Sequence, residues 1–315
     1  MTESSRDKFF YKCKLLYYKW KWIFDVVKKP RRIRDLKRGY GIAKILSQNF
    51  YVPVSTDTPV PYADRIISEK WMEDLLRSLL NNKSVFIDVG AHIGQTMLKV
   101  KASQPLCRYI GIEPQKECVE FLEKLIKINN LENYHSVWAA AAPGGQTSSN
   151  LYIPRPGATS STTAPEFMPQ KYLHSESRTV PAISVDELKK SEKFDIDEIS
   201  MIKIDVERNE LSVLQGCDDV MKTDRPCILL EILPFENDTM FSSQVELKEL
   251  MDSKQYEMYR VIKNKNLDHV EALEKVEKWP LAFQPGSRTR YYRDYLFIPE
   301  ENAGRLNFSA NSKLP

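Results

Sequence analysis

Residues 85–94 read Val85-Phe86-Ile87-Asp88-Val89-Gly90-Ala91-His92-Ile93-Gly94, an apolar run that leads into a turn with two glycines. A short uninterrupted apolar run is typical of a parallel strand that is buried on both faces. Glycines after such a strand let the backbone approach a ligand that a Cβ atom would exclude. Nineteen residues after Gly94, the apolar run 109–113 ends in Glu113, where a carboxylate can accept hydrogen bonds from both hydroxyls of a ribose. Together the two runs predict a nucleotide-binding crevice.

From about residue 64 onward, strand-like and helix-like patterns alternate, which predicts an α/β fold with a parallel sheet covered by helices. The expected strands are 85–89, 109–113, 134–141, 201–205, 227–232, 256–262 and 291–298. The expected helices lie near 71–80, after 94, and near 119–128, 184–190, 209–222 and 243–253. Three strands end in the acids Glu113, Asp205 and Glu231, at the edge where open α/β sheets bind their ligands.

Residues 143–181 break this rhythm because they are rich in Pro, Gly, Ser and Thr, with Ser160-Ser161-Thr162-Thr163 at the centre. We interpret them as a loop over the active site, since a structureless insertion of this length in a compact domain is usually functional or disordered. A plain linker is the alternative. We therefore expect three parts: a basic, aromatic and helical extension at 1–63, the α/β domain at 64–300, and a loose tail at 301–315.

Residues 7–38 interleave basic and aromatic side chains. An apolar stripe recurs there at steps of four and three, as expected for one face of a helix, and comprises Phe9, Cys13, Leu16, Trp20, Ile23 and Val27. Lys14, Lys21 and Lys28 fall on the opposite face. One interpretation is a helix that anchors the protein at an anionic membrane surface. The other is a helix that covers this or a partner domain with its lysines in solvent.

The composition limits the location and the partners of the chain. A net charge of +3 over 315 residues is close to balance, so the chain as a whole lacks the basic footprint of a nucleic-acid-binding protein. Its five cysteines are scattered without a C-x-x-C pair, and no signal-peptide pattern is present, which predicts reduced thiols in the cytoplasm. No apolar run approaches the roughly 18 residues of a membrane-spanning helix.

The glycine turn narrows the choice of nucleotide. A dinucleotide-binding turn is expected to read G-x-G-x-x-G, and its second glycine admits the pyrophosphate to the helix N-terminus. Here His92 occupies the position of that second glycine, and no G-x-x-x-x-G-K-[ST] phosphate loop is present. The ligand that remains has an adenine and a ribose but no phosphates. S-adenosylmethionine meets this description.

Five ordered blocks of the chain resemble those of the FkbM-family methyltransferases, namely 88–95, 111–114, 184–188, 202–207 and 225–231. The resemblance implies a Rossmann-like class I fold with a seven-stranded, mostly parallel sheet flanked by helices. It implies methyl transfer from S-adenosylmethionine to a hydroxyl of a sugar, a glycan or a related small molecule. The cofactor-binding residues that we expect from it and from the turn are Asp88, Gly90, His92, Gly94, Glu113 and Ala140.

Methyl transfer to a hydroxyl requires alignment of donor and acceptor and a base that takes the proton from the oxygen. Asp205 is the leading candidate, because in this fold the end of the fourth strand faces the sulfonium. Glu207, Glu231 and then His92 follow. The three carboxylates could instead hold a divalent cation that also grips a diol, and both interpretations stay open.

One position departs from the family pattern, because Arg208 stands where a glycine is common. A glycine there supplies a positive φ or a close backbone approach. Either the turn tolerates arginine, or Arg208 projects into the cleft and alters substrate choice, or the chain is a non-catalytic, membrane-associated relic of the fold. A nucleic-acid methyltransferase with 7–38 as a basic arm is a further alternative. We also expect Asp186 to cap a helix. We expect Lys203 to extend its ammonium out of the sheet end, and the alternative is that it points inward and pairs with a carboxylate.

Overall fold

The computed structural model describes residues 30–54, 66–153, 161–164, 176–233, 238–277, 279 and 293–304. The amphipathic pattern at 7–29 and the tail beyond 304 lie outside these ranges. Within them, no helix is long and apolar enough to cross a membrane. The described cysteines, Cys107, Cys118, Cys217 and Cys227, are all free thiols.

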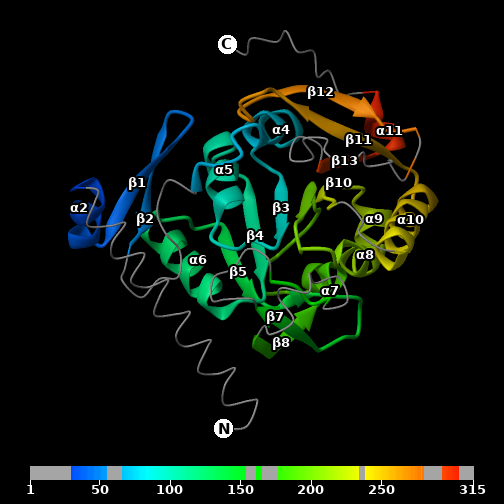
Figure 1. The fold of residues 1–315 in the computed structure, drawn as a ribbon, viewed down its shortest axis with the longest axis horizontal. Coiled ribbons are helices and arrows are strands. Elements are labelled where there is room, and N and C mark those ends of the chain that lie inside the picture. Colours follow the sequence, from blue (N-terminus) through cyan, green and yellow to red (C-terminus); the bar gives the residue numbers. More distant parts are fainter. Residues whose placement is uncertain are drawn as a thin grey trace.

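An eight-stranded sheet forms the centre of the molecule (Figure 1). Its strands, in spatial order, are β12 (Val270–Lys275), β11 (Tyr256–Lys263), β13 (Asp294–Pro299), β10 (Cys227–Glu231), β9 (Met201–Ile204), β3 (Val85–Val89), β4 (Arg108–Glu113) and β5 (Tyr134–Trp138). The five strands from β10 to β5 are parallel, whereas β13 is antiparallel to both of its neighbours. The α/β, Rossmann-like fold is thus confirmed. The sheet has one strand more than the seven expected, because β12 pairs with the outer edge of β11.

The order of the strands reverses between β3 and β9. The chain moves outward from β3 to β4 and β5, then returns to β9 and continues in the other direction to β10. Two crossovers therefore leave on opposite sides of this pair of strands. A ligand-binding crevice is expected outside the carboxyl ends of the strands at such a switch point.

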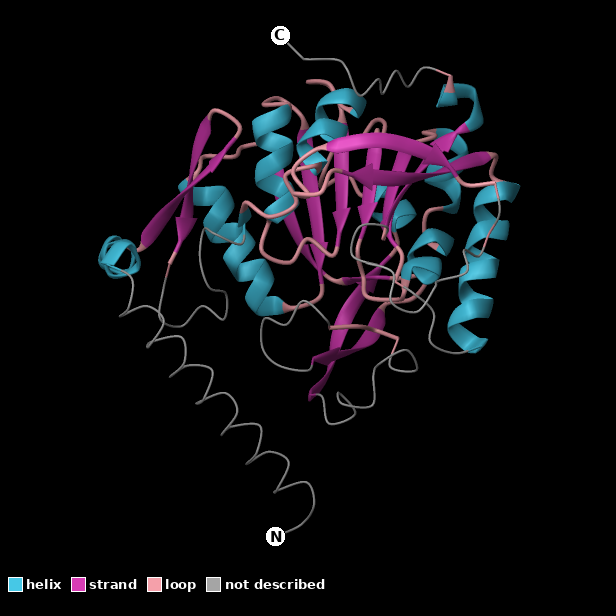
Figure 2. Ribbon diagram, turned by 45° about the horizontal axis from the view of Figure 1, so that its top comes forward, coloured by secondary structure: helices cyan, strands magenta, loops and turns pink. Residues whose placement is uncertain are grey.

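Helices cover both faces of the sheet, as Figure 2 shows. One layer consists of α4 (Met72–Leu79), α5 (Gln95–Ser103) and α6 (Lys116–Ile128), and the other of α7 (Val185–Lys190), α8 (Glu210–Gln215), α9 (Asp218–Thr223) and α10 (Asp238–Ser253). The short helix α11 (Glu300–Ala303) follows β13. Phe86 of β3 packs into the first apolar layer, and its neighbours Val85 and Ile87 pack into the second. Burial on both faces explains why this strand reads as an unbroken apolar run.

The described part of the region before residue 64 contains a hairpin, which the expected helical extension did not include. A short helix, α2 (Pro30–Arg38), precedes the hairpin of β1 (Tyr40–Ile45) and β2 (Gln48–Pro53). The hairpin packs its alternate residues Ala43, Phe50 and Val52 into the core beside α6. The Asn129 side chain at the end of α6 accepts from the main chain of Tyr51 and donates back to it, at 2.8 and 2.7 Å. The sequence did not predict this hairpin, because only a few residues alternate between buried and exposed and many basic residues surround them.

The segment 143–181 is also more regular than a loop. It contains β7 (Ser148–Ile153) and β8 (Glu176–Ile183), which with β6 (Ala140–Ala141) form a separate three-stranded sheet. Residues 161–164 lie between these two strands in sequence, and Thr162 makes an isolated antiparallel bridge with Tyr152. The expected loop is therefore a β-ribbon. Residues 161–164, which include Ser161, Thr162 and Thr163, lie beside β7 at this bridge.

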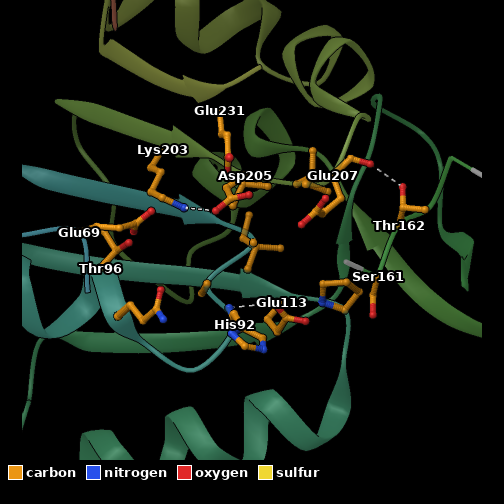
Figure 3. A pocket seen from close by; sticks show the side chains of 18 of the residues that line it. Glu69, His92, Thr96, Glu113, Ser161, Thr162, Lys203, Asp205, Glu207 and Glu231 are labelled. Atoms are coloured by element: carbon orange, nitrogen blue, oxygen red, sulfur yellow. Dashed lines mark hydrogen bonds and ion pairs between the residues drawn. The ribbon is translucent and has the colours of Figure 1, made fainter. Parts of the chain in front are cut away.

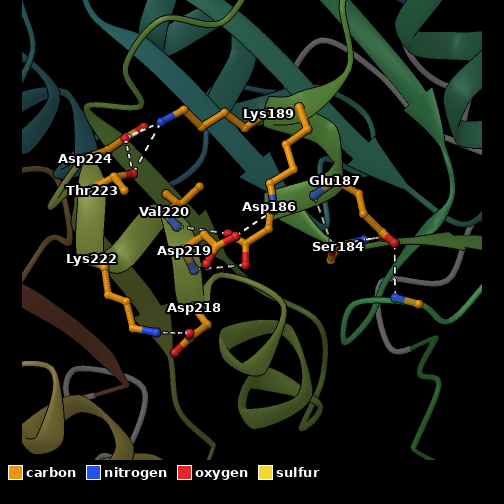
Figure 4. A network of polar contacts seen from close by, with 12 residues as sticks. Ser184, Asp186, Glu187, Lys189, Asp218, Asp219, Val220, Lys222, Thr223 and Asp224 are labelled. Carbon is orange, nitrogen blue, oxygen red and sulfur yellow. Dashed lines mark hydrogen bonds and ion pairs between the residues drawn. The ribbon is translucent and has the colours of Figure 1, made fainter.

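The second layer of helices is joined by a network of caps (Figure 4). Ser184 is the N-cap of α7 and forms a reciprocal capping box with Glu187. The carboxylate of Asp186 accepts hydrogen bonds from the main-chain N–H groups of Asp219 and Val220, at 3.0 and 2.9 Å. Asp186 therefore caps a helix, as expected. The helix that it caps is the neighbouring α9 rather than its own.

Asp186→Ala removes the acceptor for two main-chain N–H groups at the start of α9. We expect the free energy of unfolding to fall by about 1 kcal/mol, the usual cost of a lost helix cap, as measured by urea unfolding and circular dichroism. The control is Glu192→Ala, because Glu192 is exposed and forms no hydrogen bond or ion pair among the described residues. Equal stability of the two variants would contradict the cap.

Candidate active site

A cavity of about 520 Å³ lies at the carboxyl ends of β3, β4, β9 and β10, at the switch point of the sheet (Figure 3). Its volume falls within the range of roughly 300–1,000 Å³ that is common for small-molecule sites. Seven of the nine site residues expected from the sequence line this cavity: Gly90, His92, Glu113, Ala140, Asp205, Glu207 and Glu231. The other two, Asp88 and Gly94, do not.

The glycine turn after β3 forms one wall of the cavity. Gly90 has a φ of +83°, and a Cβ atom on it would collide with the carbonyl oxygen of Asp205. Only glycine therefore lets the end of β3 lie this close to the end of β9. His92 also has a positive φ, of +46°, which directs its main-chain N–H toward the neighbouring strand end. The conformation of this turn therefore shapes the wall of the cavity.

Glu113, at the end of β4, is fixed by two main-chain donors. Its Oε2 accepts from the N–H of His92 at 2.9 Å, and its Oε1 accepts from the N–H of Gln115 at 2.8 Å. Each carboxylate oxygen has a second lone pair, so both can still accept a hydrogen bond from a ligand in the cavity. Burial raises the pKa of Glu113 to about 7. The geometry suits a pair of neighbouring hydroxyls.

Asp88 and Gly94 contribute to the packing of the fold and do not line the cavity. Asp88 is fully buried on β3, where its Oδ2 accepts a hydrogen bond from the Tyr109 hydroxyl at 2.6 Å. A Cβ on Gly111 would lie 3.0 Å from that hydroxyl, so this glycine leaves room for the contact. A Cβ on Gly94 would meet the side chains of α6, so Gly94 lets α5 and α6 pack closely.

Lys203 points inward, contrary to our expectation. It is 8% exposed, lies opposite Asp88 in the pairing of β3 with β9, and lines the cavity. Its Nζ is 3.0 Å from Asp205 Oδ2 and 3.8 Å from Asp88 Oδ1. Burial acts to lower the pKa of Lys203, but these two carboxylates outweigh it and the net shift is upward. The sequence pattern did not reveal that Asp88 lies opposite this lysine on the neighbouring strand.

The three candidate catalytic carboxylates come together at one wall of the cavity. Asp205 follows β9 directly, Glu207 lies two residues further on, and Glu231 ends the adjacent strand β10. Burial, and then the charge of Asp205, raise the pKa of Glu207 to about 7. Burial and the charges of Asp205 and Asp294 also raise the pKa of Glu231. This wall therefore holds groups that can bind and release protons near neutral pH.

Several lining residues were missed in the sequence. The antiparallel strand β13 begins where β10 ends, so Asp294 lies opposite Glu231 and Arg293 is 3.8 Å from the Glu231 carboxylate. Lys263, at the end of β11, forms an ion pair with Asp294 and lies 4.1 Å from the centre of the Trp71 ring. The antiparallel direction of the last strand, β13, could have indicated them, because it puts the first residues of that strand at the ligand-binding edge.

Residues 161–163, between β7 and β8 in sequence, reach the cavity. Ser161, Thr162 and Thr163 are among its lining residues, in agreement with the expectation that this segment lies over the site. The Thr162 hydroxyl donates to the main-chain oxygen of Glu207 at 2.9 Å, and the Asn209 side chain donates to Thr163 Oγ1 at 2.7 Å. These contacts attach residues 161–163 to the turn that follows β9.

The family model of methyltransferase FkbM domains matches residues 88–258, which is more than half of the chain. The chain belongs to this family. Methyltransferase sdnD of Sordaria araneosa is 26% identical over 204 residues, which cover 57% of this chain and 72% of that protein. Among solved structures, methyltransferase FkbM of Methylobacillus flagellatus KT has a TM-score of 0.43 at 13% identity. That match covers 70% of this chain and 44% of the other, so the chain spans less than half of that relative. An O-methyltransferase of Bacillus cereus in complex with SAH gives a TM-score of 0.39 at 11% identity, with 76% and 82% covered.

Arg208 of this methyltransferase occupies a backbone conformation that favours glycine. Its φ is +82°, and that of the preceding Glu207 is +55°. The side chain does not line the cavity, so the alternative in which it enters the cleft does not hold. It extends beside α8 and α10 instead, where its Nη1 contacts Met240 Sδ at 2.8 Å. The Arg208 main-chain N–H donates to Glu210 Oε1 at 2.9 Å, which helps to hold the turn.

The carboxylates were also considered as alternative ligands for a divalent cation. Within the described ranges, no group of three or more His, Cys, Asp or Glu side chains has the arrangement of a metal site. Two of the acids in the cavity are engaged by bases instead, because Lys203 pairs with Asp205 and Lys263 pairs with Asp294. The geometry therefore presents these acids as partners of ammonium groups.

Glu207→Gln tests the raised pKa of Glu207 through the pH dependence of stability. The pKa of Glu207 rises from 4.5 to about 7 on folding, so its contribution to stability is complete below pH 4.5 and is lost as the pH rises through 7. We expect the variant to exceed the wild type in free energy of unfolding by about 1–3 kcal/mol at pH 8, and to match it near pH 4.5. Denaturant unfolding at several pH values measures this. Glu123→Gln, at an exposed site on α6, serves as control. A pH-independent difference would contradict the assignment.

Proposed function

We propose that this methyltransferase transfers a methyl group from S-adenosylmethionine to a hydroxyl of a sugar, a glycan or a related small molecule. One observation carries the proposal. A glycine turn and a carboxylate suited to a ribose share a single cavity with a wall of carboxylates that can take up a proton, Asp205, Glu207 and Glu231. The first half fits the donor, and the second half fits the removal of a proton from an acceptor.

The residues present fit an adenosyl donor. Glu113 presents two fixed oxygens to a pair of ribose hydroxyls, and the small side chains of Ala140 and Ala141 leave room for a flat ring beside them. The basic side chains of the described lining, Lys203, Lys263 and Arg293, each lie beside a carboxylate, so none is reserved for a phosphate. When bound, S-adenosylmethionine supplies an electrophilic methyl group on a sulfonium.

Asp205 is suited to act as the base. It follows β9, beside the glycine turn, and Lys203 holds its Oδ2 at 3.0 Å. This contact fixes the carboxylate and leaves Oδ1 to receive the proton from the acceptor oxygen. Glu207, whose pKa burial raises to about 7, can then exchange that proton near neutral pH. Orientation and proton transfer are the two demands of the reaction, and residues of one turn meet both.

The far wall of the cavity suits a polyhydroxylated acceptor. It holds the acid–base pairs Lys263–Asp294 and Arg293–Glu231. Elsewhere in the lining, Ser161 and Thr162 add hydroxyls. A sugar hydroxyl both donates and accepts hydrogen bonds, so adjacent hydroxyls match such a wall. A purely apolar acceptor would remove water from these ion pairs without offering them any hydrogen bond in return.

The donor half is tested by Glu113→Gln, which replaces one carboxylate oxygen by an amide that donates. We expect S-adenosylmethionine to bind at least about tenfold more weakly in titration calorimetry, because a charge-assisted hydrogen bond to the ribose is lost. The control is Glu120→Gln, at an exposed position of α6 that is outside the cavity. Unchanged affinity in the Glu113→Gln variant would refute the donor assignment.

The acceptor half is tested by labelled methyl transfer into extracted glycan, lipid and small-molecule fractions, with mass spectrometry to identify a product heavier by one methyl group. With that product in hand, Asp205→Asn should lower kcat by about 100-fold or more while donor affinity stays within about threefold. Asp197→Asn, at an exposed position outside the cavity, is the control. Transfer to nitrogen or to a nucleic acid, or full activity of the Asp205→Asn variant, would overturn the proposal.

A further inference from the structure

Glu69 is a carboxylate at the cavity that the proposed reaction does not use. It lies before α4 and outside the matched family region, with a φ of +56°. Its side chain lines the cavity and is accessible. Among the described residues its carboxylate forms no hydrogen bond or ion pair. The position is held by the main chain, because the Glu69 carbonyl accepts from the N–H of Met72 at 3.1 Å.

Most other acids in or beneath the cavity are already engaged. Glu113 accepts from two main-chain N–H groups, Asp205 is paired with Lys203, and Asp294 is paired with Lys263. Asp88, the acid expected at the methionine end, is sealed beneath the cavity against Tyr109 and Lys203. The methionine end therefore lacks the carboxylate that the family resemblance assigned to it.

The connectivity of the donor places its methionine group beside Glu69. The ribose lies between adenine and methionine in the molecule, so if Glu113 holds the ribose and Ala140 flanks the adenine, the methionine leaves toward β3 and α5. Thr96, in the first turn of α5, lines that end of the cavity. Figure 3 shows Glu69 and Thr96 on one side of the cavity, with Ser161 and Thr162 on the opposite side.

We propose that Glu69 binds the α-ammonium group of the methionine moiety of the donor, in place of the sealed Asp88. This inference rests on the proposed donor site but not on the identity of the acceptor. The methionine moiety is a zwitterion, and the start of α5 complements it. Gly94, the N-cap of α5, supplies no side-chain cap, and a helix N-terminus favours a carboxylate group. Glu69 then contributes the opposite charge.

The test uses four probes that differ in this moiety: S-adenosylmethionine, S-adenosylhomocysteine, decarboxylated S-adenosylmethionine and methylthioadenosine. The first three carry the ammonium group, and methylthioadenosine lacks both ammonium and carboxylate. For Glu69→Gln we expect the first three to bind about tenfold or more weakly by titration calorimetry. Methylthioadenosine should bind to wild type and variant within about twofold of each other.

The matched control is Glu73→Gln, four residues further on and outside the cavity, which should leave all four affinities unchanged. Equal weakening of methylthioadenosine in the Glu69→Gln variant would show a distorted cavity and overturn the inference, as would unchanged binding of S-adenosylmethionine. Loss of turnover with intact donor binding would place Glu69 on the acceptor instead and also overturn it. Failure of the wild type to bind any probe would refute the donor site itself, which distinguishes the two cases.

Discussion

The site depends on the burial of one ammonium group between two carboxylates. Lys203 lies on β9 at the point where the strand order reverses, with Asp88 on β3 and Asp205 at its own strand end. Burying a charge costs several kcal/mol unless a partner compensates it. The partners here are a fixed acid in the core and the acid proposed as base. The buried ammonium of Lys203 thereby fixes the position of the Asp205 carboxylate, the proposed base.

The crowding of acids in the cavity explains why the pKa values of several of them are raised. The lining contains six acids, Glu69, Glu113, Asp205, Glu207, Glu231 and Asp294, against three bases, Lys203, Lys263 and Arg293. Burial among so many like charges raises the pKa of Glu113 and Glu207 to about 7. A cationic sulfonium relieves this repulsion, whereas the neutral thioether left after transfer does not. For the proposed donor site, these charges therefore favour the sulfonium of the donor over the neutral product.

The sequence predicted the parts of the structure that repeat with regular spacing. The strands at 85–89, 109–113, 201–204 and 227–231 and the acids at their ends were recognisable, because a buried parallel strand is apolar throughout and its end is marked by the first polar residue. The hairpin β1–β2 was not, since a few alternating residues compete with a strong basic pattern. The inward direction of Lys203 was missed because a one-dimensional pattern carries no information on which carboxylate lies opposite in the next strand.

The residues predicted from the sequence and the residues that were missed lie in different parts of the chain. The residues proposed to bind the donor, from Gly90 to Glu113, and the carboxylates Asp205, Glu207 and Glu231 lie within the matched region 88–258. Much of the remaining lining lies outside it: Ser68, Glu69, Trp71, Lys263, Leu267, Arg293 and Asp294. These residues come from segments before the first family strand and from the strands that close the far side of the sheet. Arg208, the one departure within the family block, points away from the cavity and strains only the turn. We therefore expect the acceptor choice of this chain to depend on the flanking segments, and we expect methyl transfer itself to depend on the proposed donor turn and carboxylates.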